Sequence, residues 1–511
     1  MLMVKLYSAQ LTGLDATIIT VEVDLSPGLH IFSIVGLADK EIQESRERIG
    51  AAIKNIGGRA PHKKPHRVIV NLAPADIKKE GPAFDLPIAL GYLLASDQTK
   101  FNPEKKIFLG ELGLDGSVKP VRGVLAAAIA AKNAGFATLY VPEGNGSEAS
   151  LVSGIEIKET KNILELLDDL ENKKTIAAYL AEKTEKAEKD NRSDFSLIKG
   201  QGHAKRALEI TAAGGHNLLM QGPPGTGKTI LARTLPSILP ELAEEELIEV
   251  AKIYSAGGFL KNGEVNTERP FRSPHHTSSQ VAIAGGGNPI RPGEITLAHR
   301  GVLFLDELPE FQSYVLNSLR EPMEDRVITV SRAQGTVAFP AHVILVAAMN
   351  PCPCGHLNNP PHECVCTPGQ ITKYQRKISG PLLDRIDLFI DVPKVEIKKI
   401  DEETPDEADN TAVAEARKNV ERARRIEKER FIGQKIFTNS EMGLREIKKH
   451  CPLTESVKAL LLEAYEKHSM SPRSYYRTIK VARTIADLAE SESIKENHML
   501  EALQYRSRQE N

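Results

Sequence analysis

Residues 221–229 (QGPPGTGKT) form the motif that most specifically indicates a chemical function in this sequence, because they combine glycines with a lysine and a hydroxyl side chain. The stretch matches the pattern GxxxxGK[ST], in which glycines let backbone N–H groups surround phosphate oxygens at the start of a helix. Lys228 would add a positive charge, and the hydroxyl of Thr229 is a suitable ligand for Mg²⁺. The sequence therefore predicts a nucleotide site containing Gly222, Pro223, Pro224, Gly225, Thr226, Gly227, Lys228 and Thr229.

Two carboxylates, Asp306 and Glu307, follow the apolar run 302–305. A buried strand that ends in acids delivers them to the edge where open α/β sheets bind their ligands. We expect Asp306 to hold Mg²⁺ through water and Glu307 to polarise the water that attacks ATP. Because this pair follows a phosphate-binding loop, we interpret it as the second half of an ATP hydrolysis site.

Most of the 5 cysteines lie in two Cys-x-Cys pairs. The paired residues are Cys352, Cys354, Cys364 and Cys366. Four thiolates can surround Zn²⁺ as a tetrahedron and leave no position for a catalytic water, so such a site would be structural. A Cys₃His site with His356 or His362 is an alternative, and four reduced thiols in a loop are another, because Cys-x₂-Cys is the commoner spacing. Cys451 stands apart and is expected in a core.

The segments around these residues predict an α/β fold with a parallel sheet. The apolar run 217–220 should form a buried strand before the loop, residues 230–235 a helix after it, and 342–349 a further strand. Helices are also expected at 40–56, 124–134, 202–213, 411–430, 456–468 and 474–491, and strands at 16–23 and 67–72. The expected domains are 1–170, a charged linker at 171–193, an ATPase core at 194–400 and a helical lid at 401–511.

Length and charge limit the class of protein. The chain has 511 residues and a net charge of −2. That length corresponds to roughly three domains, and the charge excludes a simple nucleic-acid coating protein, so any DNA contact must be local. No apolar run reaches about 18 residues and the N-terminus lacks a leader-like pattern, so we expect a cytoplasmic protein without a membrane partner.

Two N-terminal segments, 80–86 (EGPAFDL) and 110–123 (GELGLDGSVKPVRG), resemble the proteolytic domain of Lon-type proteases. In that family a serine follows the Gly-Pro pair and a lysine follows the second segment. Here Ala83 and Leu125 occupy those positions, and without a hydroxyl and an amine there is no acyl-enzyme chemistry. The resemblance implies a Lon-like α+β domain that lacks protease activity and serves assembly or contacts.

Further segments identify a larger family. They are 271–277 (FRSPHHT), 284–289 (AGGGNP), 349–355 (MNPCPCG) and 378–387 (ISGPLLDRID). They resemble the magnesium-chelatase-like AAA+ ATPases, within which the match is to the ComM/YifB branch and covers nearly the whole chain. The resemblance implies ATP and Mg²⁺ as cofactors, a hexameric ring, and a DNA helicase that promotes branch migration in natural transformation.

The AAA+ resemblance also implies roles for individual residues. Gln201 would lie near the base, and Asn350 would be the sensor that touches the γ-phosphate, although an asparagine before proline also suits a turn. Arg385 would be an arginine finger that reaches a neighbouring subunit's nucleotide; its alternative is a surface ion pair with a nearby aspartate. Arg473 would be the second sensor, and Arg477, one helical turn away, remains open for that role.

Two insertions between the ATP motifs resemble the helix-two insert and the presensor hairpin of this branch. The first contains Arg272 and Arg291, and the second predicts a hairpin of strands 327–330 and 336–339 with Arg332 near its tip. Mobile basic loops in a ring would contact a DNA backbone without reading sequence. An incidental arginine on a solvated hairpin is the alternative, since aromatic residues, at 5%, offer few platforms for bases.

We therefore predict an ATP hydrolase that drives a ring along single-stranded or branched DNA. One alternative is a chelatase-type motor that inserts Mg²⁺ into a porphyrin through partner subunits, and the Lon-like domain and the cysteine pairs argue against it. Another is a protein-remodelling chaperone, and the central insertions lack the Lys-aromatic-Gly loop that would favour it.

Overall fold

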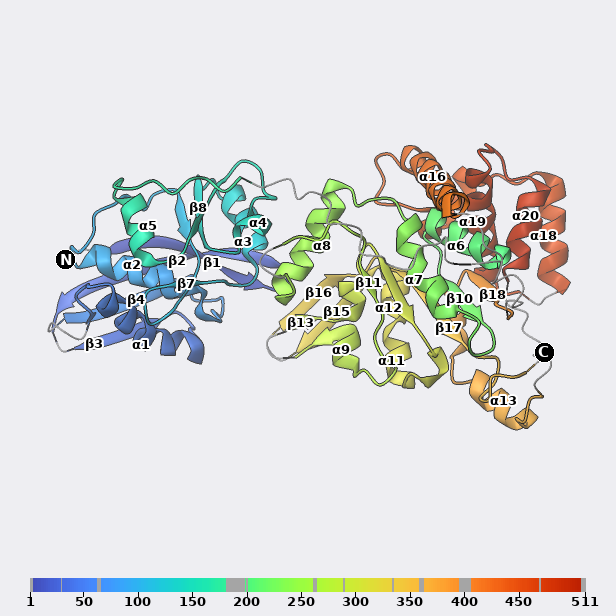
Figure 1. Cartoon of the computed structure of the whole chain (residues 1–511), viewed down its shortest axis with the longest axis horizontal. Coiled ribbons are helices and arrows are strands. Elements are labelled where there is room, and N and C mark those ends of the chain that lie inside the picture. The colour runs from blue at the N-terminus through green and yellow to red at the C-terminus, as the bar shows by residue number, and fades with distance from the viewer. Residues whose placement is uncertain are drawn as a thin grey trace. The chain divides into compact units, whose positions relative to one another are not determined.

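The chain folds into two compact units. The computed structural model describes residues 3–28, 30–61, 66–180, 198, 201–260, 264–287, 290–332, 335–357, 363–394, 406–467 and 470–506. One unit comprises Met1–Ala187 with Glu244–Asn266, and the other comprises Glu188–Ala243 with Thr267–Asn511 (Figure 1). Each unit is a mixture of helices and sheets, as the α/β prediction requires. Among the described residues, no helix combines the length and apolar character that a bilayer span requires.

The first unit contains a four-stranded sheet in the order β1-β2-β4-β3, where β3 runs parallel to β4 and the other pairs are antiparallel. Alternate residues of β2, namely Ile19, Val21 and Val23, are fully buried, as expected for a sheet with one face on a core. Helices α1 and α2 cover that core. The bounds are β1 Val4–Thr12, β2 Asp15–Pro27, β3 Ile31–Val35, α1 Lys40–Asn55, β4 His66–Ala73 and α2 Asp85–Ala95. The helix and strands predicted in this region are thereby confirmed.

A second, parallel sheet of the same unit has the order β5-β8-β9. The alanine-rich helix α3, predicted at 124–134, packs its buried residues in the core beside this sheet. The elements are β5 Lys106–Phe108, β6 Glu111–Leu112, β7 Val118–Lys119, α3 Val124–Asn133, β8 Thr138–Pro142, α4 Gly146–Ala149, β9 Glu156–Thr160 and α5 Ile163–Leu170.

Helix α8 (Glu244–Gly257) belongs to this N-terminal unit, although it lies between the two ATP motifs in the sequence. Its Ala251 is buried in the same core as α3, and the Ser255 carbonyl accepts the Gly123 N–H at 3.2 Å. Lys252 forms an ion pair with Asp15. The expected division at 171–193 does not account for this helix, which is a covalent part of the 194–400 segment.

The second unit is built on a parallel five-stranded sheet in the order β11-β14-β17-β10-β18. Its central strands are buried, apart from the partly exposed Gln221 at the end of β10, which explains why their sequences are nearly continuous apolar runs. The register pairs Gln221 with both Met349 and Asp391, and Leu305 with Ala347, so the loops after β10, β14 and β17 leave the same edge. The strands are β10 Leu218–Gln221, β11 Phe271–Arg272, β14 Val302–Leu305, β17 Ile344–Met349 and β18 Leu388–Asp391.

Short elements connect these strands. The predicted hairpin is present: β15 and β16 pair antiparallel, with Arg332 opposite Gly335 at its tip. A smaller hairpin, β12 with β13, lies in the first insertion. The connecting elements are α9 Gln280–Ala284, β12 Gly285–Gly286, β13 Arg291–Pro292, α10 Glu294–Leu297, η4 Leu308–Glu310, α11 Ser313–Ser318, α12 Arg320–Asp325, β15 Val327–Arg332, β16 Gly335–Pro340, α13 Pro368–Gln375 and α14 Gly380–Leu383.

The C-terminal segment is helical, as predicted. Its helices α16 and α19 pack against α6, the helix that leads into β10, and share one core with the sheet (Figure 1). The helices are α6 Gly202–Gly214, α7 Lys228–Ile238, α16 Asp406–Arg430, α17 Leu444–His450, α18 Glu455–Lys467, α19 Pro472–Leu488 and α20 Glu496–Gln504.

A buried carboxyl in α16 should make this unit less stable in alkali. Burial raises the pKa of Glu427 from 4.5 to about 8, with Arg424 opposing. The folded protein therefore keeps a proton on Glu427 that the unfolded chain releases. The stability linked to this proton is fully present below the unfolded pKa and is lost as pH rises through about 8. We expect Glu427→Gln to raise the free energy of unfolding by more than about 1.4 kcal/mol near pH 9.

Urea unfolding followed across that pH range would measure the effect. Exposed Glu429, on the same helix, provides the control Glu429→Gln. The prediction is wrong if both variants show the same pH dependence as the native chain.

Candidate nucleotide-binding site

The phosphate loop connects β10 to α7 and is held tightly against neighbouring backbone. A Cβ on Gly222 would lie 2.3 Å from the Val392 carbonyl oxygen, so only glycine fits there. The Gly222 N–H donates to the Met349 carbonyl at 3.2 Å, which fixes the loop to β17. Gly227, with φ 84°, caps α7, whose first residue is Lys228. The first N–H groups of a helix have no partner within it, so the start of α7 is a suitable place for phosphate oxygens to bind.

Lys228 occupies the centre of this loop. Its Nζ donates to the carbonyls of Gly222 and Pro223 at 2.7 and 2.8 Å, and lies 3.4 Å from Oδ1 of Asn350. Burial lowers the pKa of Lys228, and the charge of Asp306 partly opposes that effect. The predicted lysine and the predicted sensor asparagine therefore lie together at the carboxyl edge of the sheet.

Thr229 and Asp306 come together as a pair of oxygen ligands. The Thr229 hydroxyl donates to Oδ2 of Asp306 at 2.7 Å. The other carboxylate oxygen accepts the N–H of Glu307 at 2.9 Å, which fixes its orientation. Hard oxygen donors beside a phosphate loop are the set that Mg²⁺ prefers, so these residues fit the ion that the sequence predicted for them.

Glu307 follows directly and presents its side chain to solvent. Its backbone has φ 53° and ψ 45°, a left-handed conformation that is costly for a residue with a Cβ and is often found at functional sites. The carboxylate is 56% exposed and its Oε2 lies 3.3 Å from Nδ1 of His276. The rings of His275 and His276 are tilted at 34° to each other with centroids 4.1 Å apart. The sequence placed both histidines in the first insertion but did not indicate their approach to Glu307.

Gln201 contacts the phosphate loop from the start of α6. Its Nε2 donates to the Thr226 carbonyl at 2.9 Å. The residue has φ 52°, also left-handed, and precedes the first residue of the helix. Gln201 therefore braces the loop backbone.

The predicted arginine finger and second sensor meet at one carboxylate, Glu324 of α12. Arg385 forms an ion pair with Glu324, and Nη2 of Arg473 lies 2.5 Å from the other oxygen of the same carboxylate. The Arg385 carbonyl accepts the side-chain amide of Asn217 at 3.0 Å, and Asn217 immediately precedes β10. Both arginines thus lie toward the amino ends of the strands, away from the chain's own phosphate loop. Glu324 was not singled out by its sequence.

Arg477 has a different environment. It donates to Asp387 at 2.5 Å and to the Arg385 carbonyl at 2.8 Å. Burial raises the pKa of Asp387, but the charge of Arg477, together with His216 and the N–H of Asn217, outweighs it and holds that pKa well below its usual range. Arg477 is therefore committed to a buried ion pair that joins α19 to the connection before β18.

The three arginines proposed for DNA contact have different environments. Arg272, on β11, is held by both oxygens of Glu294 at 2.6 and 2.7 Å. Arg291 is exposed on β13. Arg332 ends β15, and its side chain lies outside the described residues.

In the N-terminal unit, the two Lon-like segments lie side by side. The Ala83 carbonyl accepts the Gly110 N–H at 3.2 Å, and the Gly110 carbonyl accepts the Leu86 N–H at 3.1 Å. Leu125 is buried in α3. The positions of a serine nucleophile and a lysine base are therefore filled by apolar side chains.

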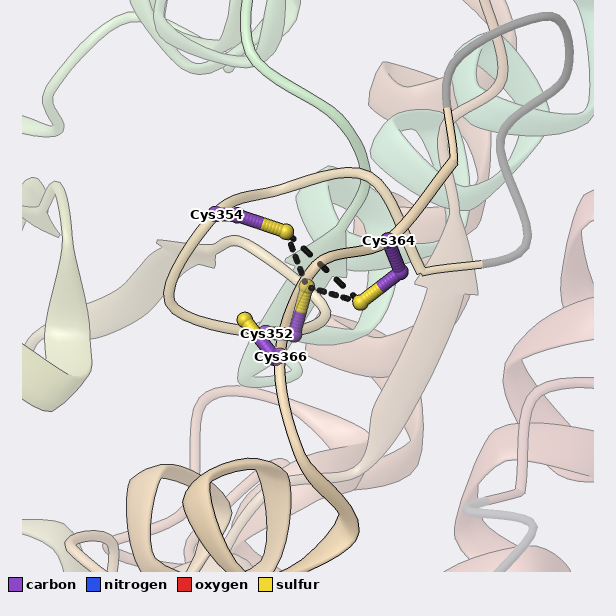
Figure 2. A group of neighbouring side chains, drawn as sticks. All are labelled: Cys352, Cys354, Cys364 and Cys366. Carbon is purple, nitrogen blue, oxygen red and sulfur yellow. Dashed lines mark hydrogen bonds between the residues drawn. The ribbon is translucent and has the colours of Figure 1, made fainter.

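The two Cys-x-Cys pairs converge after β17. The Sγ atom of Cys352 lies 3.4 Å from that of Cys354 and 3.6 Å from that of Cys364. All four sulfurs, including that of Cys366, lie within 4.8 Å of one another (Figure 2). Of the described residues, this cluster contains cysteines alone; His362 lies outside them.

Comparison with known proteins agrees with these motifs. Family models described as "Magnesium chelatase, subunit ChlI", "Subunit ChlI of Mg-chelatase" and "Magnesium chelatase, subunit ChlI C-terminal" match residues 194–400, 21–145 and 410–506. Competence protein ComM of Haemophilus influenzae is 42% identical over 509 residues, covering 98% of this chain and 97% of that protein. The uncharacterized protein YifB of Escherichia coli is 40% identical and covers 97% and 95%.

A more distant similarity concerns Lon. Lon protease 2 of Bacillus subtilis is 28% identical over 199 residues, which is 36% of this chain and 34% of the protease. The full-length matches, together with the phosphate loop, the Thr229–Asp306 pair and Asn350 at one sheet edge, show that the chain belongs to the ComM/YifB family of magnesium-chelatase-like AAA+ ATPases.

Proposed function

We propose that this protein assembles into a ring and uses ATP hydrolysis to move along DNA, remodelling branched recombination intermediates during natural transformation. The observation that carries the hydrolytic half is the convergence of Lys228, Thr229, Asp306 and Asn350 on one edge of the sheet. The name of the ComM relative, a competence protein, supports the DNA half.

The positions of these side chains support the following hydrolysis step. Lys228 holds the β- and γ-phosphates, and Thr229 with Asp306 would hold Mg²⁺. Mg²⁺, when bound, supplies charge neutralisation at the phosphate oxygens. Glu307, exposed beside His276, orients the attacking water and draws off its proton, while Asn350 aligns the γ-phosphate.

The positions of Arg385 and Arg473 support assembly into a ring. The strand between them and the phosphate loop, β10, is Leu218–Gln221, which at 3.3 Å per residue separates the two edges by about 13 Å. An arginine at the amino edge is better placed to serve a neighbour's nucleotide than its own. Repeating this head-to-tail contact closes a ring when the rotation permits, and the family resemblance indicates a hexamer.

Both arginines would then act across the subunit interface. Glu324 holds them as a pair until a neighbour's γ-phosphate competes for their charge. Since Arg477 is committed to Asp387, we assign the second sensor to Arg473.

Contact with DNA is proposed for Arg291 and Arg332, each on a hairpin in a connection between strands of the core sheet. The Arg272 charge is engaged by Glu294, so its proposed contribution is to position the insertion that carries Arg291. Such contacts would be to phosphates, would not depend on sequence, and would weaken with salt.

The test is ATP hydrolysis with and without single-stranded DNA and a four-way junction. We expect DNA to raise the rate, and Arg291→Ala to remove most of that increase while the basal rate stays unchanged. Arg445→Ala, which removes an exposed arginine from α17, is the matched control and should leave stimulation intact. Hydrolysis that ignores every DNA would overturn the DNA half and favour a chelatase-type or protein-remodelling motor.

A further inference from the structure

The cysteine cluster lies immediately beyond the sensor strand. Cys352 follows Asn350 by two positions and is fully buried, whereas Cys364 and Cys366 come from the segment that enters α13. Figure 2 shows the sulfurs of Cys352, Cys354 and Cys364 turned toward one another across the loop. Thiols brought together from two chain segments need a common partner, because the Sγ atoms offer each other only weak hydrogen bonds.

The spacing of the sulfurs fits one metal ion. Sulfurs in a tetrahedron with Zn–S bonds of about 2.3 Å lie about 3.8 Å apart. The separations here are 3.4 Å for Cys352–Cys354 and 3.6 Å for both Cys352–Cys364 and Cys354–Cys364. Disulfide-bonded sulfurs would lie about 2.05 Å apart. Four thiolates favour Zn²⁺ over the oxygen-seeking ions, and they close its coordination shell.

Backbone N–H groups around the sulfurs would stabilise the negative charge of the thiolates. The N–H groups of His356 and Val365 are directed at the Cys354 sulfur, and the N–H of Cys366 at that of Cys364. Hydrogen bonds to ligating thiolates orient them and offset the negative charge that four such ligands bring to a metal.

The same loop presses on the phosphate loop. Gly355, with φ 82°, ends the turn of the first pair, its N–H donating to the Cys352 carbonyl at 3.0 Å. A Cβ there would lie 2.5 Å from Cδ of Pro224, so the turn touches the phosphate loop directly. From the other side, Nε2 of Gln375 in α13 donates to the Pro351 carbonyl at 3.2 Å.

We propose that Cys352, Cys354, Cys364 and Cys366 bind one Zn²⁺, which clamps the loop after β17 against Pro224 and so fixes Asn350 beside Lys228. Binding releases the thiol protons and ties the segment before α13 to the end of the sensor strand. The ion is a structural clip and takes no part in the chemistry. The effect on hydrolysis rests on the proposed ATPase function; the metal site does not.

Metal content of the purified full chain tests the site directly. We expect about one zinc per chain, lost in Cys364→Ser/Cys366→Ser and kept in Cys451→Ser, whose cysteine lies buried in the C-terminal helices. A native chain without zinc, or a double variant that retains it, would overturn the proposal.

A second measurement does not require a variant to fold. Exchange of the metal for Co²⁺ in the native chain should give the intense visible bands of a tetrahedral thiolate site. Weak bands typical of oxygen or nitrogen ligands would contradict four-cysteine coordination.

The effect of zinc on ATP hydrolysis is measured separately. Zinc removal by a chelator should lower the turnover number more than it raises the KM for ATP, since Asn350 acts on the γ-phosphate, and adding Zn²⁺ back should restore the rate. An unchanged turnover number after complete removal of zinc would overturn the proposed effect of zinc on the position of Asn350, but it would not contradict the metal site itself. A zinc-loaded native chain without ATPase activity would instead overturn the proposed function.

Discussion

Replacing Glu307 with glutamine should lower the rate of ATP hydrolysis by about 100-fold or more. Glutamine keeps the size of the side chain and its approach to His276, but it cannot accept the proton of the attacking water. The Thr229–Asp306 pair is unaffected, so ATP and Mg²⁺ should still bind. Single-turnover hydrolysis and the Kd for a fluorescent ATP analogue would separate the two effects.

The chain supplies a matched control for this variant. Glu310 lies on the same short segment, three residues further along, and forms a surface ion pair with Lys377 at 3.1 Å. Glu310→Gln removes the same charge and should leave hydrolysis within about twofold, as surface ion pairs contribute little. Equal losses in both variants would show that charge near the site, and not the Glu307 carboxylate, controls the rate.

Arg385→Ala should lower hydrolysis by about 1000-fold, the scale reported for arginine fingers in phosphoryl transfer, while ATP binding persists. Arg473→Ala should act in the same direction, because both side chains share Glu324. Arg376→Ala, which removes an exposed arginine that follows α13, is the control and should hydrolyse ATP normally.

A mixing experiment decides whether Arg385 acts on a neighbour. Arg385→Ala chains retain an intact phosphate loop, and Lys228→Ala chains retain an intact Arg385. If each arginine completes the next subunit's site, the mixture of two inactive variants should recover activity at roughly one interface in four. A mixture as inactive as its components, under conditions where mixed oligomers form, would place Arg385 in its own chain's site or remove it from catalysis.

Several parts of the nucleotide site could be predicted from sequence because their signals are local. The phosphate loop needs a strand, glycines and a helix in succession, and 217–235 contains all three. Parallel strands buried on both faces are continuous apolar runs, which located β14 and β17 and therefore Asp306 and Asn350. The cysteine pairs were equally visible, since ligand spacing is a sequence property.

The partners of these residues were not predictable in the same way. Neither the approach of His276 to Glu307 nor the pairing of Arg272 with Glu294 has a local pattern. The helix α8 shows an apolar stripe in the sequence, but such a stripe does not identify the core that it joins. Only the folded chain places it in the N-terminal unit.

The sequence by itself predicted an ATP site and the residues proposed to hold the phosphates and Mg²⁺, and it showed that the Lon-like segments lack a nucleophile, because residue type and short-range spacing specify those properties. The tertiary structure decided that Arg385 and Arg473 share Glu324 at the sheet's amino edge, and that four sulfurs from two segments lie within 4.8 Å of one another in a loop that contacts Pro224. Those arrangements depend on strand order and on packing between residues far apart in the chain, which no local pattern encodes.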